Sequence, residues 1–381
     1  MSARSMPAES DRPSPEQFLN LIRRQERGRL KVYLGSSAGV GKTYAMLREG
    51  QRLKEQGVDV AIGLIETHGR AETAQQIGSL EVIPAREIEY RGVKLREMDL
   101  DAILTRRPTV CLVDELAHTN APGSRFPKRY QDVEELLRAG IHVITTVNVQ
   151  HLESLYDEVE RVTAVKVKER LPDRVLAEAD QIVNIDVSAE DLLDRLKAGK
   201  VYPPERAERA MENFFTLPNL TRLREITLTE LAHLIDHRAR RAEADRAPAS
   251  TTDRVMVGLS SMSPNAPALL RRTSRMADRL NVPWYAVYIQ TPSEDATRAD
   301  AATLRMLYKN LELAKQLGGT PMEFKGRDVA NTILAFAREY GIKIIVMGRS
   351  QRPWHRRLWG GSVIERLIRD AEGFDVLIVD V

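Results

Sequence analysis

The sequence predicts an α/β protein with two parallel sheets in successive domains. Short apolar runs typical of buried parallel strands alternate with longer helical stretches along most of the chain. This alternation is interrupted by a helical, strand-free region and a polar stretch, and then resumes. At 381 residues, the chain is also longer than one hydrophobic core usually organises.

Composition narrows the class of protein further. The chain has 57 basic and 54 acidic residues, and this net charge of +3 lacks the basic excess typical of nucleic-acid-binding proteins. A single cysteine, Cys111, excludes an intrachain disulfide and favours a reducing compartment. We find neither a signal peptide nor an apolar run long enough for a membrane helix, and therefore expect a cytoplasmic protein.

The first domain is predicted over residues 14–187, after a polar N-terminus, 1–13, that we expect to be disordered. Ser14-Pro-Glu-Gln17 has the residues of a helix start, with a Ser cap and Pro in the first turn. The strands are predicted at Leu30–Leu34, Val58–Ile65, Thr109–Val113, Ile141–Val147 and Ile182–Ile185. Their apolar character favours a parallel sheet covered on both faces.

A helical subdomain (188–245) and a linker (246–252) are predicted to precede a second α/β domain over 253–381. In that domain, strands are predicted at Val255–Leu259, Trp284–Ile289, Met322–Phe324, Ile342–Met347 and Val376–Val379. Helical stretches near 265–280, 296–317, 328–340 and 361–371 separate them. This order predicts a small, open, flavodoxin-like doubly wound sheet.

A phosphate-binding loop follows the first strand and precedes a helical run. Glycines permit backbone angles that turn several N–H groups towards an anion, and the helix N-terminus adds to this site. Lys42 would reach the β- and γ-phosphates of ATP, and Thr43 would ligate Mg²⁺. The predicted nucleotide-binding residues are Ser36, Ser37, Ala38, Gly39, Val40, Gly41, Lys42 and Thr43. The first domain is therefore predicted to be P-loop NTPase-like.

One position of this motif departs from the usual pattern. The first glycine of the motif is replaced by Ser36, and Gly35 comes one residue earlier. Because Ser is small, we expect it to be tolerated. The alternative is a Gly-rich turn between strand and helix that binds no ligand.

The strand Thr109–Val113 ends in two acidic residues. Asp114 is predicted to lie beside the phosphate loop and to hold Mg²⁺ with Thr43. Glu115 could orient an attacking water and is the candidate catalytic residue. Many strands end in acidic residues, so the phosphate loop upstream is what favours this interpretation. Whether ATP is hydrolysed stays open.

Polar residues at other strand ends are further candidates. Asn148 and Gln150 could sense the γ-phosphate, although ordinary loop capping is an equal alternative. His118 could belong to a switch loop or could simply be solvated. His233 and His237 are four residues apart, as in a metal pair, but without a third ligand nearby we expect surface helix positions.

The second domain carries two candidate ligand features. A basic loop with two tryptophans runs from the end of the fourth strand to a helix start, and it includes Gly348, Arg349, Ser350, Gly361 and Ser362. These could form an anion site at the helix N-terminus, or the loop could be a basic surface segment. The second feature combines Ser261 and Ser263 with aromatic residues on the next strand, which are more often core residues.

With these motifs in view, the chain resembles the cytosolic input region of the KdpD family, bacterial sensor kinases that control potassium uptake. The resemblance covers about Arg27–Val381. It is carried by the phosphate loop, Glu66-Thr-His-Gly-Arg70, Val113-Asp-Glu-Leu-Ala-His-Thr-Asn120, Thr145-Thr-Val-Asn-Val-Gln-His-Leu-Glu-Ser154 and Val201-Tyr-Pro-Pro204. Complete sensor kinases continue into membrane helices and a kinase domain; we expect this chain to be either free-standing or part of a longer protein.

The C-terminal domain is similar to the universal stress protein family. Many members bind ATP through a spaced glycine pattern, which Gly348 and Gly361-Ser362 match, while Gln351 replaces the middle glycine. Because this domain binds cyclic di-AMP in some KdpD proteins, the resemblance implies cyclic di-AMP as a candidate ligand here. The residues that match that motif are Ser261, Ser263, Trp284, Ala286 and Tyr288, with Trp284-Tyr285 in place of the usual Phe-Thr.

These features together predict a nucleotide-binding sensor of potassium or osmotic homeostasis. It would bind ATP and Mg²⁺ in the first domain, and cyclic di-AMP or another adenine nucleotide in the second. The resemblance implies a sensor kinase or response regulator of the Kdp system as partner, and the sequence leaves the oligomeric state open. The alternatives are an autonomous P-loop ATPase and a stress-protein scaffold with vestigial nucleotide sites.

Overall fold

The computed structural model describes residues 27–244, 254–261, 263, 265–280, 282–292, 301–349 and 363–380, without the side chains of 204, 206, 236–244 and 301. The predicted disordered segment, the helix start at Ser14 and the predicted linker lie outside this part of the chain. Two compact units are present. The first holds the described residues up to Val147, with Ala179–Ile185 and Ala198–Tyr202; the second holds the rest.

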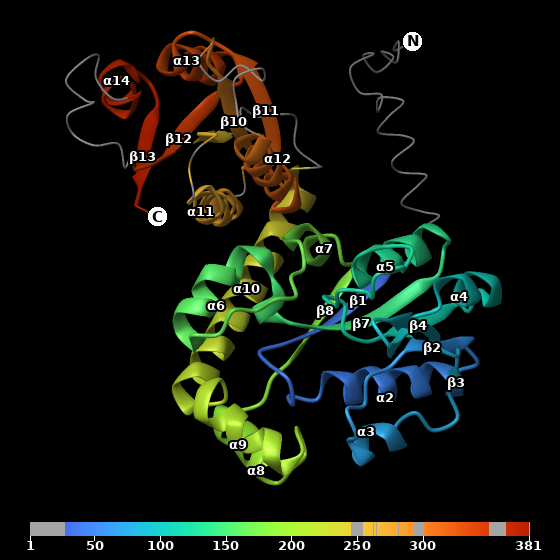
Figure 1. Cartoon of the computed structure of the whole chain (residues 1–381). Helices are drawn as coiled ribbons and strands as arrows, with labels where there is room; N and C mark the ends of the chain where they lie inside the picture. The colour runs from blue at the N-terminus through green and yellow to red at the C-terminus, as the bar shows by residue number, and fades with distance from the viewer. Residues whose placement is uncertain are drawn as a thin grey trace, which may run out of the picture. The chain divides into compact units, whose positions relative to one another are not determined.

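The first unit is built on a six-stranded sheet in the order β3-β2-β6-β7-β1-β8 (Figure 1). The strands are β1 (Leu30–Gly35), β2 (Val60–Leu64), β3 (Glu81–Val82), β6 (Val110–Val113), β7 (His142–Asn148) and β8 (Gln181–Ile185). The pairs with a resolved register are all parallel. The five strands predicted for this domain are confirmed, and the two-residue β3 is an addition at the sheet edge.

The helices of this unit are α2 (Lys42–Glu55), α3 (Ala71–Gln75), α4 (Leu100–Arg106) and α5 (Arg129–Arg138), and helices cover both faces of the sheet. On β2, Ile62 packs in one core cluster with Met46 and Leu47 of α2. The next residue, Gly63, faces the opposite way, where an added Cβ would lie 2.7 Å from Ile103 of α4. Successive strand residues therefore bury against helices on opposite faces, as an apolar parallel strand requires.

A two-stranded antiparallel hairpin, β4 (Arg86–Tyr90) and β5 (Val93–Glu97), was not predicted from the sequence. Its strands read Arg-Glu-Ile-Glu-Tyr and Val-Lys-Leu-Arg-Glu, and most of their side chains are exposed or half-buried. Strands with so little buried surface lack the apolar run by which buried strands are recognised.

The second unit begins with helical segments. They are η2 (Val149–His151), η3 (Glu153–Leu155), α6 (Tyr156–Thr163), α7 (Asp173–Ala177), α8 (Ala189–Lys197), α9 (Pro204–Asn213) and α10 (Leu217–Ala244). Residues 189–244 contain helices and no strand, as the sequence predicted. Among the described residues, none of the helices combines the length and the apolarity that crossing a membrane would require.

The second unit also holds a five-stranded sheet in the order β11-β10-β9-β12-β13. Its elements are β9 (Arg254–Leu259), α11 (Ala266–Leu280), β10 (Trp284–Gln290), α12 (Ala301–Gln316), β11 (Thr320–Lys325), α13 (Val329–Glu339), β12 (Ile342–Gly348), α14 (Val363–Asp370) and β13 (Asp375–Val379). Residues of α11 pack with Val257 on one face, and residues of α13 and α14 pack with Met256 on the other. The doubly wound sheet is therefore confirmed, and its strand order reverses between β9 and β12.

Candidate functional site in the first unit

The phosphate loop joins β1 to α2 and has the backbone that its glycines permit. Gly39 and Gly41 have φ angles of 90° and 104°, in the left-handed region that glycine adopts without a steric penalty. Ser36 is not among the residues with positive φ, so serine causes no strain there. At Gly35 an added Cβ would lie 2.6 Å from the Val40 side chain and 3.0 Å from that of Lys42. Gly35 thus lets the lysine chain pass close to the strand end.

Lys42 is the buried cation of this loop. Its side chain is 8% exposed, and its ammonium group donates a hydrogen bond of 2.9 Å to the Ser37 carbonyl oxygen. Burial lowers the pKa of Lys42 to about 8, although the carboxylates of Asp114 and Glu115 act in the opposite direction. A buried ammonium with a depressed pKa is stabilised by an anion, which is what a phosphate would supply.

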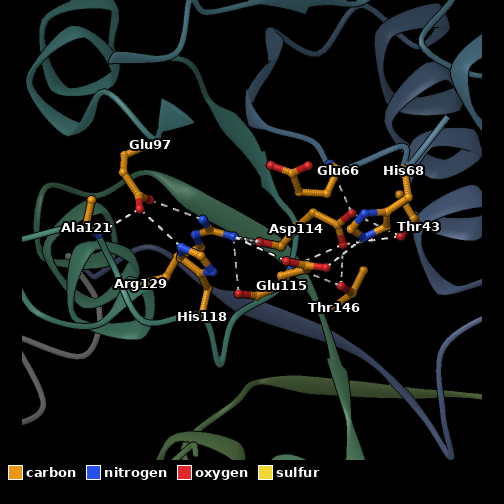
Figure 2. A network of polar contacts seen from close by, with 10 residues as sticks. All are labelled: Thr43, Glu66, His68, Glu97, Asp114, Glu115, His118, Ala121, Arg129 and Thr146. Carbon is orange, nitrogen blue, oxygen red and sulfur yellow. Dashed lines mark hydrogen bonds and ion pairs between the residues drawn. The ribbon is translucent and has the colours of Figure 1, made fainter. Parts of the chain in front are cut away.

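Asp114 is the centre of the hydrogen-bond network drawn in Figure 2, and it is 1% exposed. The Thr43 hydroxyl lies 3.1 Å from Asp114 Oδ2, and the Thr146 hydroxyl donates to Oδ1. Backbone N–H groups of Glu115 and Glu66 add contacts of 3.1 and 3.4 Å. Burial raises the pKa of Asp114 despite these bonds, so the ionised form would be stabilised by a bound cation.

Thr146 is a site residue that the sequence analysis missed. It lies on β7, which is placed between β1 and β6, and thus between the strands that carry the phosphate loop and Asp114. Its hydroxyl also accepts a hydrogen bond of 3.2 Å from the Glu115 N–H. The only signal in the sequence is a pair of threonines in an otherwise apolar strand, and strand order decides which of them meets Asp114.

The donor set at Thr43 and Asp114 fits Mg²⁺. A hydroxyl and a carboxylate are hard oxygen ligands, and Mg²⁺ in nucleotide sites uses one or two protein ligands together with phosphate oxygens and water. Among the described residues, no group of three or more His, Cys, Asp or Glu side chains suited to a metal occurs.

Glu115 follows Asp114 and has an unusual backbone for a non-glycine residue, with φ of 56°. Its Oε1 lies 2.9 Å from Nε2 of His68, which also has a positive φ, of 50°. The hydrogen bond with Glu115 raises the pKa of His68, although burial and Arg70 act against it. The side chains are 45% and 39% exposed, so the pair lies at the surface of the site.

Arg129 is a fully buried residue that contacts the backbone next to Glu115, and it was not identified from the sequence. Its Nη1 donates to the Asp114 carbonyl oxygen at 3.1 Å, and its Nη2 lies 3.4 Å from Glu97 Oε2. Glu97 Oε1 accepts from the Ala121 N–H at 2.7 Å and lies 3.2 Å from His118 Nε2 (Figure 2). Burial tends to raise the pKa of Glu97, but these contacts outweigh it and the pKa is lowered.

The other candidate residues predicted before the second α/β domain lie outside the hydrogen-bond network around Asp114. Asn148 ends β7 and Gln150 lies in η2, and both cluster with the second unit. Their side-chain carbonyl oxygens are buried without a hydrogen-bond partner in the described structure. Their γ-phosphate-sensing role stays a prediction. His233 lies on α10, and the side chain of His237 is outside the described part.

In the second unit, some of the predicted ligand residues gather at the carboxyl ends of strands and others do not. Tyr288 pairs with Leu259 near the end of β9, Ser261 follows two residues later, and Gly348 ends β12, the other neighbour of β9. Trp284 instead pairs with Val255 at the opposite end of the strands and lies in the core with Ala286. The strand register therefore separates Trp284 from Ser261.

The remaining candidates of this unit are dispersed or undescribed. Ser263 is half-buried, and its N–H donates to the Ser260 carbonyl oxygen at 3.4 Å. Arg349 is exposed and pairs with Asp380, with 3.1 Å between Nη1 and Oδ2. Ser350, Gly361 and Ser362 lie outside the described residues. The predicted anion site at that helix N-terminus therefore stays a prediction.

Comparison with known proteins matches two families along the chain. Residues 26–235 match the KdpD family, described as the osmosensitive K⁺ channel His kinase sensor domain. Residues 251–380 match the universal stress protein family. Among solved structures, a universal stress protein in complex with cAMP is 23% identical, covering 34% of this chain and 98% of that one, with a TM-score of 0.27.

Relatives of similar sequence show which family the chain belongs to. The sensor protein KdpD of Escherichia coli is 43% identical over 97% of this chain, which spans only 41% of that relative. A putative sensor protein KdpD of Synechocystis sp. is 43% identical, and the match covers 93% of this chain and 94% of that one. With a family match over more than half of its residues and a relative of matching length, the chain belongs to the KdpD family.

Proposed function

We propose that the first unit binds ATP with Mg²⁺ and that its nucleotide state is the signal this chain passes on. The observation that carries the proposal is the contact of 3.1 Å between Thr43 and buried Asp114, directly after a loop with left-handed Gly39 and Gly41. The loop N–H groups would hold phosphate, and Lys42 would neutralise the β- and γ-phosphates. Mg²⁺, held by Thr43 and Asp114, would supply further positive charge to the phosphates.

The binding proposal is tested by Lys42→Ala in the full chain, titrated with ATP and Mg²⁺ by calorimetry. We expect at least about a 100-fold loss of affinity, because the variant removes the buried cation nearest to the loop. Lys54→Ala, on the exposed end of the same helix, is the matched control and should bind like the wild type. Equal ATP affinity of Lys42→Ala and the wild type would refute the site.

Glu115 is proposed to act on a water next to the γ-phosphate, since its carboxylate is held at the surface of the site by His68. Phosphate release by the wild type and by Glu115→Gln separates two functions. Negligible turnover in both, with intact ATP binding, supports a sensor that responds to occupancy. Steady turnover that Glu115→Gln abolishes supports an ATPase instead.

A second nucleotide site is proposed at the reversal of strand order between β9 and β12. In doubly wound sheets, ligands bind outside the carboxyl ends of the strands at such a point. Ser261, Tyr288 and Gly348 are the residues that favour this edge, with an adenine nucleotide as ligand and cyclic di-AMP as one candidate. Titration of Lys42→Ala with ATP and with cyclic di-AMP tests the site in isolation from the first. No heat with either would remove it.

By its family, the chain is proposed to work in potassium-dependent two-component signalling. Ligand occupancy would shift the population of conformations that contact a sensor kinase or response regulator of the Kdp system. Reciprocal effects between ATP and the second ligand would measure that coupling, because linkage requires each to change the other's affinity by the same factor.

A further inference from the structure

The loop that follows β2 passes over both acidic residues of the site. The Glu66 N–H contacts Asp114 Oδ2 at 3.4 Å, and the His68 ring contacts Glu115 at 2.9 Å. The loop then ends at Arg70, whose N–H donates to the Thr67 carbonyl oxygen and which stands at the N-terminus of α3. Arg70 therefore directly follows a loop that contacts both acidic residues of the site.

The guanidinium of Arg70 is oriented by a segment more than a hundred residues later. Its Nε donates a hydrogen bond of 3.1 Å to the carbonyl oxygen of Val201, a side chain that is only 1% exposed. The neighbouring Lys200 pairs with Glu72, with 3.0 Å between Nζ and Oε1. Within the described part of the chain, neither Nη group of Arg70 has a hydrogen-bond or ion-pair partner. Arg70 is thus half-buried, fixed at Nε and open at the end that carries two donors.

Arg70 brings a positive charge to the edge of this site. It follows the loop residues that contact Asp114 and Glu115, and it lowers the pKa of His68 against the larger effect of the hydrogen bond with Glu115. Because charge effects fall with distance, the guanidinium lies near the His68–Glu115 pair. A cation in this place, with no carboxylate paired to it within the described part of the chain, is stabilised by a multiply charged anion.

We propose that Arg70 is a second phosphate-binding cation of the site, which donates from its Nη groups to the terminal phosphate of a bound nucleoside triphosphate while Val201 holds its orientation. This inference rests on the proposed function and adds selectivity to it. Arginine presents parallel donors that match two phosphate oxygens, which a lysine does not. Loss of Arg70 should therefore affect the triphosphate more than the diphosphate.

A purely structural role makes a different prediction. If the only role of Arg70 were to hold residues 198–202 in place through its contact with Val201, its removal would weaken binding of ATP and ADP alike. Lys200→Ala, which removes the neighbouring ion pair with Glu72, would then have a similar effect. The ratio of the ATP affinity to the ADP affinity therefore separates a phosphate contact from a structural contact.

The test is calorimetric titration of the full chain with ATP and with ADP, each with Mg²⁺, for the wild type, Arg70→Ala, Arg70→Lys and Lys200→Ala. We expect Arg70→Ala to weaken ATP binding about 10-fold or more and ADP binding less than about 3-fold. Arg70→Lys should recover part of the lost ATP affinity, because lysine restores the positive charge but not the parallel donors of the guanidinium. Arg48→Ala, an exposed arginine of α2, and Lys200→Ala should leave the ratio unchanged.

Equal losses for ATP and ADP in Arg70→Ala, or unchanged affinities for both, would overturn the role of Arg70 while leaving ATP binding in place. A wild-type chain that binds neither nucleotide would overturn the proposed function, and the role of Arg70 with it. If Arg70→Ala fails to fold, as judged by circular dichroism, the ratio in Arg70→Lys decides. An ATP-to-ADP ratio equal to that of the wild type would then overturn the proposal.

Discussion

His68 Nε2 and Glu115 Oε1 lie 2.9 Å apart, and both residues have left-handed backbones, with φ of 50° and 56°. Each such backbone costs about 1 kcal/mol or more for a residue other than glycine, and it persists only where surrounding contacts enforce it. Arg129 enforces it at Glu115 by holding the preceding carbonyl oxygen. The edge of the phosphate-loop site therefore has two residues with strained backbones whose side chains are hydrogen-bonded to each other.

The His68–Glu115 contact should depend on pH. Because the folded-state pKa of His68 is raised, the contact stabilises the fold fully below the unfolded-state pKa of about 6.5 and loses this effect as pH rises through the folded pKa. A double-mutant cycle with His68→Gln and Glu115→Gln should give a coupling energy of about 0.5 kcal/mol at pH 5.5, small because both side chains are exposed. Urea denaturation measures it, and a coupling that is as large at pH 8.5 would contradict the assignment.

Asp114→Asn should stabilise the ligand-free chain. Burial raises the pKa of Asp114, so at neutral pH the fold carries an unfavourable charge that the amide removes. The amide can keep the bonds with Thr43 and Thr146, and only the contact of 3.4 Å from the Glu66 N–H is replaced by two opposed donors. We expect a gain of about 1 kcal/mol at pH 7.5, shrinking as pH falls towards 4.

The same variant should lose the Mg²⁺-dependent part of ATP affinity, since a neutral amide is a poor Mg²⁺ ligand. Thermal unfolding without ligand and titration with ATP at several Mg²⁺ concentrations measure the two effects. If the ligand-free Asp114→Asn chain is less stable than the wild type at pH 7.5, the buried carboxylate does not lower the free energy of unfolding.

Arg271 should be a large contributor to the stability of the second unit. It lies on α11 and is 5% exposed, with contacts of 2.7 and 2.9 Å to the Asp157 carboxylate and 3.1 Å to Glu153. Arg271→Ala removes a buried guanidinium and leaves buried Glu153 and half-exposed Asp157 with fewer partners, so it should lower the free energy of unfolding by about 2–3 kcal/mol. Arg272→Ala, at the exposed next position, is the control and should cost less than about 0.5 kcal/mol. Similar costs for both variants in urea denaturation would contradict this reading.

Two half-buried acids in the second unit should make its stability fall as pH rises. Their partial burial raises the pKa of Glu230 to about 8 and that of Asp173 to about 6. Asp173 and Asp278 act on Glu230 in the same direction as burial, whereas Arg275 and Arg279 oppose it. The folded state therefore binds more protons than the unfolded state between about pH 4 and 8, so stability decreases over this range.

Glu230→Gln should flatten that dependence by up to about 1 kcal/mol per pH unit and stabilise the chain at pH 8. Glu208→Gln, an exposed residue of α9, is the matched control and should leave the slope unchanged. Urea denaturation at pH 5, 6.5 and 8 gives the slopes. Identical slopes for Glu230→Gln and the wild type would mean that Glu230 is ionised throughout.

Features that depend on neighbours along the chain could be predicted from the sequence. The buried parallel strands are apolar runs, and Gly39 and Gly41 set the left-handed backbone of the loop between β1 and α2, so both can be read locally. The hairpin of β4 and β5 could not, because its exposed strands have no apolar run. Trp284 fits a ligand motif by spacing, yet its place at the start of β10 makes it a core residue.

Tertiary structure alone decided which polar groups meet. Thr146 reaches Asp114 because β7 is inserted between β1 and β6, an order that strand composition does not encode. Glu97 and Arg129 come from a hairpin and a helix, and Arg70 is oriented by Val201, 131 residues later. Hydrogen bonds and ion pairs require contact within a few ångströms but impose no sequence separation, so their partners are fixed by how the strands and helices pack.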